Sequence, residues 1–88
     1  MNEHASERQR SVIATVERWD SRSMEYVHDD RVPATTCRAW AGAGRLLTVR
    51  YNGQMARAKK ELNGAFYSYR SAGAHRHRIK FAIAPAPL

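Results

Sequence analysis

The sequence is poor in cysteine, in long apolar runs and, after residue 30, in acidic residues. Cys37 is the single cysteine, so the chain cannot form an internal disulfide or a Cys-based zinc site. No apolar run approaches the roughly 18 to 20 residues that span a bilayer, and residues 1–10 are polar where a signal peptide has its apolar core. We therefore expect a cytoplasmic protein that depends on packing for its stability and has no membrane partner.

The remaining composition is that of one small folded domain. A chain of 88 residues supports a single modest core, and 43% hydrophobic with 26% charged residues is typical of a globular protein. We find no internal repeat and no low-complexity tract. We expect residues 1–88 to form one domain, with residues 1–6 and 84–88 as flexible tails.

The charges are distributed unevenly along the chain. Residues 1–30 hold four arginines and seven acids, whereas residues 31–88 hold eight arginines, three lysines and only Glu61. This asymmetry predicts one strongly positive surface, which is typical of a protein with a polyanionic partner, although a merely solvated basic surface is the alternative. The excess of arginine over lysine and the 14 alanines fit a GC-rich bacterium, its plasmid or its phage.

The N-terminal third favours a helix over residues 7–19. Val12, Val16 and Trp19 follow helical spacing, and Ser6 is a suitable N-cap. A strand over residues 12–19 is the competing interpretation, because Val, Ile and Thr are frequent there. Residues 20–34 then form a connection that ends at Pro33.

A short second helix is predicted to begin at Thr35 or Thr36. It would carry Cys37, Trp40 and Ala41 inward at helical spacing. The glycines of residues 42–44 would end it in a sharp turn.

Residues 45–62 support two interpretations, a helix over about residues 48–62 or a strand that enters a hairpin. Tyr51, Met55, Ala58 and Leu62 fall on one helical face, with Thr48 as N-cap, which predicts a basic third helix. Alternatively, Leu47, Val49 and Tyr51 alternate and precede Asn52-Gly53, the pattern of a strand that enters a type I′ hairpin turn.

The C-terminal part predicts a β-hairpin over residues 65–83. The odd positions Ile79, Phe81 and Ile83 are apolar, whereas Arg76, Arg78 and Lys80 alternate with them. A strand here would therefore have one apolar and one basic face. Pro85 and Pro87 prevent its continuation.

This order of elements resembles the winged helix-turn-helix family. The resemblance covers about residues 7–83 and implies an α+β fold with three helices followed by a C-terminal two-stranded antiparallel hairpin. It further implies that the third helix lies in the major groove of DNA while the hairpin contacts the backbone. The exposed residues of that helix are then candidates for reading bases: Arg50, Asn52, Gln54 and Arg57. The remaining candidates would contact phosphates: Lys59, Lys60, Arg70, Arg76, Arg78 and Lys80.

Other constellations are weaker. Tyr67 and Tyr69, with Phe66 and Phe81, could form a stacking platform for single-stranded nucleic acid, but such rings more often fill a hairpin core. Trp19 and Trp40 are also expected in the core.

No pattern indicates an enzyme. The spacing of His75 and His77 could hold a metal ion, but no paired cysteine supports such a site. Cys37 is expected to be an inert apolar residue. We therefore expect no catalytic residue, metal or cofactor.

The sequence thus predicts a small DNA-binding protein, most simply a transcriptional regulator of a bacterium, plasmid or phage. Double-stranded DNA is the expected partner, and a homodimer is one way to bind it. The alternative is an inhibitor or adaptor whose basic face docks on an acidic or nucleic-acid-binding surface of a host protein complex. A third interpretation is an RNA-associated protein.

Overall fold

A computed structural model describes residues 9–69 and 76–84. This part of the chain contains seven β-strands and no helix. The strands are β1 (Gln9–Asp20), β2 (Glu25–His28), β3 (Thr35–Ala41), β4 (Leu46–Tyr51), β5 (Gln54–Lys60), β6 (Phe66–Ser68) and β7 (His77–Ile83). No helix long and apolar enough to cross a membrane occurs among these residues.

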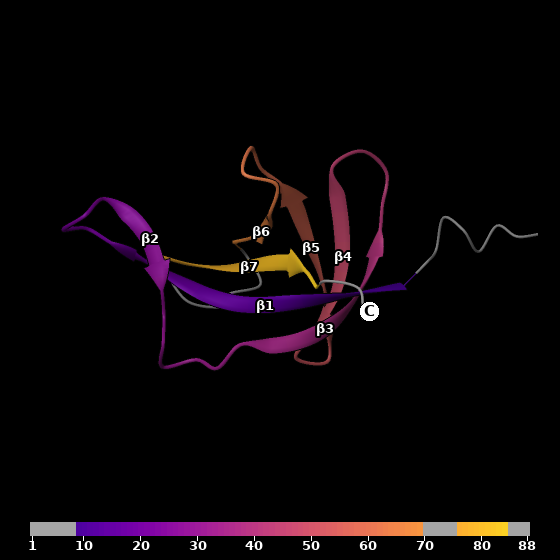
Figure 1. Cartoon of the computed structure of the whole chain (residues 1–88), viewed down its shortest axis with the longest axis horizontal. Coiled ribbons are helices and arrows are strands. Elements are labelled where there is room, and N and C mark those ends of the chain that lie inside the picture. The colour runs from indigo at the N-terminus through magenta and orange to yellow at the C-terminus, as the bar shows by residue number, and fades with distance from the viewer. Residues whose placement is uncertain (1–8, 70–75, 85–88) are drawn as a thin grey trace, which may run out of the picture.

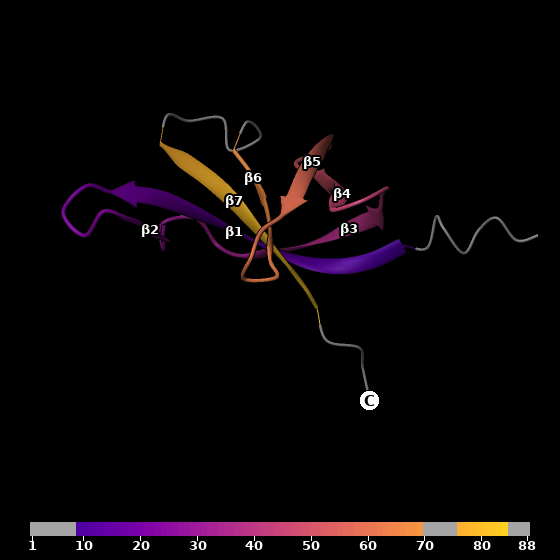
Figure 2. The ribbon, with the colours of Figure 1, turned by 90° about the horizontal axis from the view of Figure 1, so that it is seen from above.

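Six of the strands close into an antiparallel barrel. The order is β1-β3-β4-β5-β6-β7, and β7 pairs with β1 to complete the circle. The long strand β1 pairs with β7 along one edge, while its other edge pairs first with β3 and then with β2. β2 therefore lies outside the barrel, where it pairs with the last residues of β1 (Figures 1 and 2).

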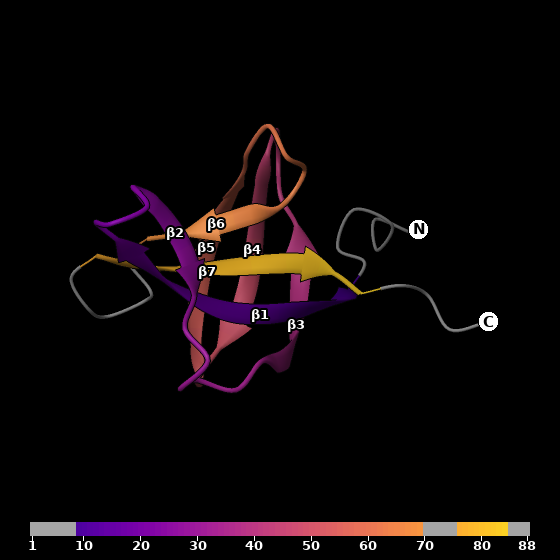
Figure 3. The same ribbon diagram turned by 60° about the vertical axis from the view of Figure 1, so that its left-hand side comes forward.

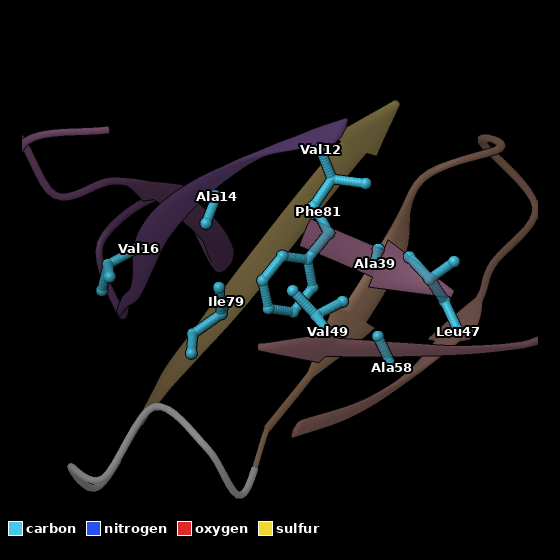
Figure 4. Close-up of a cluster of buried hydrophobic side chains, with 9 residues drawn as sticks. All are labelled: Val12, Ala14, Val16, Ala39, Leu47, Val49, Ala58, Ile79 and Phe81. Carbon is cyan, nitrogen blue, oxygen red and sulfur yellow. The ribbon is translucent and has the colours of Figure 1, made fainter. Parts of the chain in front are cut away.

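The barrel is flattened into two groups of strands that cross. β1 and β7 run across the sheet formed by β3, β4 and β5 (Figure 3). Between them lies a core of fully buried side chains from both groups, with Phe81 and Ile79 on one side and Leu47 and Val49 on the other (Figure 4). The inward positions follow a period of two, as a strand requires.

Alanine fills much of this narrow interior. Ala14, Ala39, Ala56 and Ala58 are all at most 4% exposed and point inward at alternate positions. A barrel of six strands has little internal space, so small side chains are needed opposite Phe81 and Leu47.

The expected α+β fold is wrong, and so is the resemblance to the winged helix-turn-helix family. The described residues form an all-β barrel, so no recognition helix exists there. The helix expected over residues 7–19 is replaced by β1, as the competing interpretation proposed. Its inward residues are Val12, Ala14 and Val16, while Ile13 points outward and is 38% exposed.

The two other helices are strands as well. The expected helix that begins at Thr35 or Thr36 is β3, and the segment 45–62 contains β4, a tight turn and β5. The alternative interpretation of this segment is confirmed, because Asn52 and Gly53 have positive φ values of 52° and 77° between paired strands. Both central residues of a type I′ turn require that conformation.

The C-terminal hairpin is confirmed as a pair of strands. β6 and β7 are antiparallel, and Ile79 and Phe81 face the core as their alternation predicts. The pair is part of the barrel wall and not a separate wing. The tails expected at residues 1–6 and 84–88 lie outside the described residues, except for Ala84, whose amide donates to the Ser11 carbonyl.

Candidate nucleic-acid interface

One outer side of the barrel concentrates cations that have no carboxylate partner among the described residues. Because Ala39, Val49 and Ala58 point inward, their neighbours on β3, β4 and β5 point outward. Strand pairing then places outward residues side by side, in the rows Trp40–Thr48–Arg57, Arg50–Met55 and Leu46–Lys59. We call the outer side of these three strands the basic face, after its cations Arg38, Arg50, Arg57 and Lys59.

The basic face contains no acid. Residues 35–60 hold four arginines and two lysines but neither aspartate nor glutamate. Within residues 9–69 and 76–84, no carboxylate lies within ion-pair distance of the four cations that define the face. Like charges on neighbouring strands repel one another, so this arrangement favours binding of an anion.

The acids gather in a different region. Of the described acidic residues, all except Glu61 lie in residues 17–31, which we call the arm: Glu17, Asp20, Glu25, Asp29 and Asp30. The arm comprises the end of β1, β2 and the turns on both sides of β2. Figures 1 and 2 show it at the opposite end of the molecule from β3, β4 and β5.

Some charged side chains of the arm form internal contacts. The buried carboxylate of Asp29 accepts hydrogen bonds from the Arg31 side chain at 3.0 and 3.1 Å, and His77 lies 3.4 Å from it. The Arg31 hydrogen bonds hold the pKa of Asp29 well below its ordinary value of 3.8, although burial acts in the opposite direction. Asp20 similarly accepts a hydrogen bond from Ser23.

Arg78 on β7 is held between the arm and β6. Its Nε donates to Glu17 Oε1 at 2.6 Å, and its guanidinium stacks 3.9 Å from the Tyr67 ring and 4.1 Å from the Tyr26 ring. Its Nη1 also donates to the Tyr69 hydroxyl. Burial lowers the pKa of Arg78, but the hydrogen bonds to Glu17 and Tyr69 outweigh this and raise it. The contacts of Arg78 therefore hold β7 to its neighbours, and its charge is paired with the Glu17 carboxylate.

The residues expected to read bases are brought only partly together. Arg50 and Arg57 point outward on the basic face, on neighbouring strands. Asn52 forms the β4–β5 turn, and Gln54 is the exposed first residue of β5. They do not form one side of a helix.

The expected phosphate contacts are dispersed. Lys59 lies on the basic face, and Lys60 lies at the end of β5, with its Nζ 6.0 Å from the centre of the Phe66 ring. Lys80 points outward on β7, where its strand neighbours are Tyr67 and Thr15. Arg76 is exposed just before β7, and Arg70 lies outside the described residues.

Three side chains of the basic face were missed by the sequence analysis. Trp40, expected in the core, points outward and is partly exposed, and Arg38 lies two residues before it on the same side of β3. Met55, expected on an inward helical face, points outward beside Arg50 and is 53% exposed. The alternation of Cys37, Arg38, Ala39 and Trp40 could have indicated that Arg38 and Trp40 share one side of a strand, because a period of two separates outward from inward residues.

The aromatic residues divide between the core and the outer surface. Phe81 is buried in the core and Phe66 packs against it, whereas Tyr67 and Tyr69 contact Arg78 outside this core cluster, Tyr67 buried and Tyr69 exposed. Trp19 is also outside the barrel, where its ring meets Tyr26 edge to face at 5.2 Å.

Two hollows adjoin the basic face. One, of about 520 Å³, lies between β5 and β6 and is lined by residues that include Met55, Arg57 and Tyr69. The other, of about 620 Å³, includes Glu61 beside Arg45 and Lys60, so its charges are mixed.

The weaker chemical candidates gain no support from the described geometry. Cys37 packs against the core, within 3.7 Å of the Thr35 hydroxyl. In the described part of the chain, no three His, Cys, Asp or Glu side chains are placed to hold a metal, and His75 lies outside that part.

Comparison with protein families, with curated proteins and with solved structures finds no match for this chain.

Proposed function

We propose that this protein binds nucleic acid through the basic face. The observation that carries the proposal is the convergence of cations from three neighbouring strands on one surface without an acid. Arg31 and Arg78 differ from these cations, because each of the two is paired with a carboxylate. A set of cations that lack such partners is the electrostatic pattern of a phosphate-binding surface.

The residue types suit a nucleic acid better than a simple anion. Arginine presents a planar guanidinium that can bond two oxygens of one phosphate, and three of the four cations of the basic face are arginines. Trp40 adds an aromatic ring on the same side of the sheet. Cations combined with an aromatic side chain on a sheet are typical of nucleic-acid-binding surfaces.

This proposal does not depend on a recognition helix. Duplex DNA was expected because a basic helix would enter its major groove, and the described residues provide no such helix. Phosphate contacts from a sheet surface give affinity without sequence specificity. We therefore propose a binding protein whose affinity is largely electrostatic.

A salt titration with charge-reversed variants tests the proposal. If the four cations each neutralise a phosphate of a single strand, affinity falls about 50-fold between about 50 and 200 mM salt. The variant R50E/R57E should lose most of this binding. The matched control R18E/R22E changes the net charge equally but alters exposed residues of the arm, and it should bind nearly as well as the unchanged protein.

Fluorescence anisotropy of a labelled oligonucleotide measures these affinities, and thermal unfolding checks that both variants fold. Equal loss of binding in the two variants would mean that net charge, and not the basic face, governs the interaction. Absence of binding by the unchanged protein at micromolar concentration would remove the proposal.

The inhibitor or adaptor interpretation uses the same cations and remains the rival. A pull-down from nuclease-treated lysate separates the two. A stoichiometric protein partner that is lost with R50E/R57E would replace nucleic acid as the ligand of this face.

A further inference from the structure

The hollow between β5 and β6 is a groove on the outer surface of the barrel. The two strands pair only through Lys59 with Tyr67 and Lys60 with Phe66. Towards the start of β5 they separate, and a space of about 520 Å³ opens between them. Its volume lies in the range of small-molecule sites, so it can hold a group the size of a nucleobase.

This groove concentrates exposed apolar side chains. Leu46, Met55 and Tyr69 line it and are 45%, 53% and 46% exposed. They are three of the seven large apolar side chains that are exposed in the described part of the chain. Scattered apolar side chains on a surface need no explanation, but a cluster inside one groove indicates an apolar ligand.

Cations flank the apolar wall. Arg57 and Lys59 also line the groove, and both point outward from β5, two residues apart. That separation is about 6.6 Å along a strand, on the order of one nucleotide step of an extended chain. The ligand must therefore present an apolar surface and negative charges at adjacent positions.

We propose that this groove takes an unstacked base of a single-stranded nucleic acid, with the adjoining phosphates at Arg57 and Lys59. The inference rests on the proposed function and specifies its substrate. A duplex keeps the faces of its bases stacked inside and presents phosphates outside, whereas a single strand offers both to the protein. The ring of Tyr69 and the thioether of Met55 provide the surface on which the base packs.

The position of Tyr69 supports this role. Its hydroxyl donates to Glu61 Oε2 and accepts from Arg78 Nη1, so the ring is anchored at its polar end. Its ring also meets that of Tyr26 at 6.0 Å. An anchored, half-exposed ring binds a base at a small cost in side-chain entropy.

An acidic peptide is the competing occupant. The edge of β5 before Lys59 has no strand partner among the described residues of β6, so a peptide could pair with it. The observations favour a nucleotide, because the groove continues into the basic face and includes an exposed aromatic ring. Stacking on that ring stabilises a bound planar base more than a bound aliphatic or acidic side chain.

The test compares oligonucleotides that differ only in their bases. A fluorescein-labelled thymidine oligomer should bind the full chain about tenfold more tightly than an abasic oligomer of equal length and charge. DNA and RNA versions of the single strand identify the sugar preference. Either single strand should bind more tightly than a duplex of the same length.

Two variants locate the base. Met55→Ala should weaken binding of the thymidine oligomer severalfold and leave binding of the abasic oligomer unchanged. Tyr69→Leu should act in the same direction, and Tyr69→Phe, which keeps the ring, should restore most of the affinity. The Met55 side chain forms no hydrogen bond with the described residues, so its variant remains informative if Tyr69→Leu unfolds.

Different experimental results would reject the inference and the proposed function. Equal affinity for the thymidine and abasic oligomers, with binding still abolished by R50E/R57E, would retain the basic face and reject a base in the groove. Displacement of the oligomer by a glutamate-rich peptide that Met55→Ala no longer binds would assign the groove to peptides.

Discussion

The basic face and the arm differ in the carboxylates that lie among their arginines. In the arm, Arg31 contacts Asp29, and at its junction with the barrel Arg78 contacts Glu17. On the basic face, Arg50 and Arg57 project from neighbouring strands with no carboxylate nearby in the described structure. The partners of an arginine, more than its presence, therefore distinguish one that holds the fold together from one that we propose binds a ligand.

The same contrast applies to the aromatic residues. Trp19 is fixed against Tyr26 in the arm, whereas Trp40 lies partly exposed on the basic face beside Thr48. Each region contains one of the two tryptophans. A difference in their surroundings can therefore be measured by fluorescence.

The largest expected effect comes from removal of one arginine that is paired with a carboxylate, compared with removal of one on the basic face. Arg78→Ala should destabilise the fold by about 2 to 3 kcal/mol, because it leaves Glu17 without its partner and opens the space between three tyrosine rings. Arg57→Ala should change the stability by less than about 0.5 kcal/mol. Urea denaturation measures both.

Binding should show the reverse order. Arg57→Ala should weaken nucleic-acid binding and reduce its salt dependence, because one phosphate contact is lost. Arg78→Ala should have little effect on binding under conditions in which it remains folded. If Arg57→Ala unfolded the barrel, or if Arg78→Ala alone abolished binding, the division between the two regions would be wrong.

The next effect concerns the tryptophans. In Trp19→Phe, where Trp40 is the remaining tryptophan, bound nucleic acid should quench the fluorescence. In Trp40→Phe the signal of Trp19 should hardly change. Trp40→Ala should also weaken binding about tenfold, as loss of one stacking ring does in similar surfaces. Quenching of Trp19 alone would place the ligand on the arm.

The smallest effect is a pH dependence of the arm. The pKa of Asp29 is lowered by the Arg31 hydrogen bonds, so its carboxylate takes up a proton at lower pH in the folded than in the unfolded protein. It therefore stabilises the fold above its ordinary pKa of 3.8, and this contribution is lost as the pH falls below that value.

Asp29→Asn should accordingly be less stable than the unchanged protein near neutral pH. The difference should shrink as urea denaturation is repeated towards about pH 3. Nucleic-acid binding near neutral pH should be the same in both proteins, because Asp29 is remote from the basic face. A stability difference that stayed constant with pH would show that the carboxylate charge is not the cause.

The sequence predicted local strand patterns better than the fold. Ile79 and Phe81 alternate with charged residues and face the core, and Asn52-Gly53 forms the type I′ turn of the alternative interpretation. These patterns are local, because a strand period and a turn each depend on a few neighbouring residues. The closure of β1 on β7 depends on contacts between distant residues and has no such signal.

Helical spacing misled the prediction for residues 48–62, because Tyr51, Met55, Ala58 and Leu62 fall on one helical face. In the structure, Ala56 and Ala58 point inward at alternate positions and Met55 points outward. The narrow barrel interior requires such small inward side chains, so the residues follow the period of a strand. In β1, the small Ala14 points inward while the larger Ile13 points outward. The positions of the large apolar residues therefore suggested the spacing of a helix, although the strand has a period of two.

The positive charge of the candidate site was predicted from the sequence, but the set of residues that form the site was not. Arg50, Arg57 and Lys59 do lie together, yet they lie on a sheet. Arg78 seemed equivalent from its alternation with Ile79, but Glu17, 61 residues earlier in the chain, pairs with it. No local pattern can reveal a carboxylate partner that is so distant in the chain. Arginines with and without such a partner therefore looked alike in the sequence.

The most direct measurement is an NMR titration of the full chain, uniformly labelled with nitrogen-15, with a single-stranded oligonucleotide. The account predicts that amide and indole signals shift at Trp40, along β4 and β5, and at Tyr69, while signals of β2 and Asp29 stay in place. Shifts confined to the arm, or no shifts at saturating oligonucleotide, would contradict it.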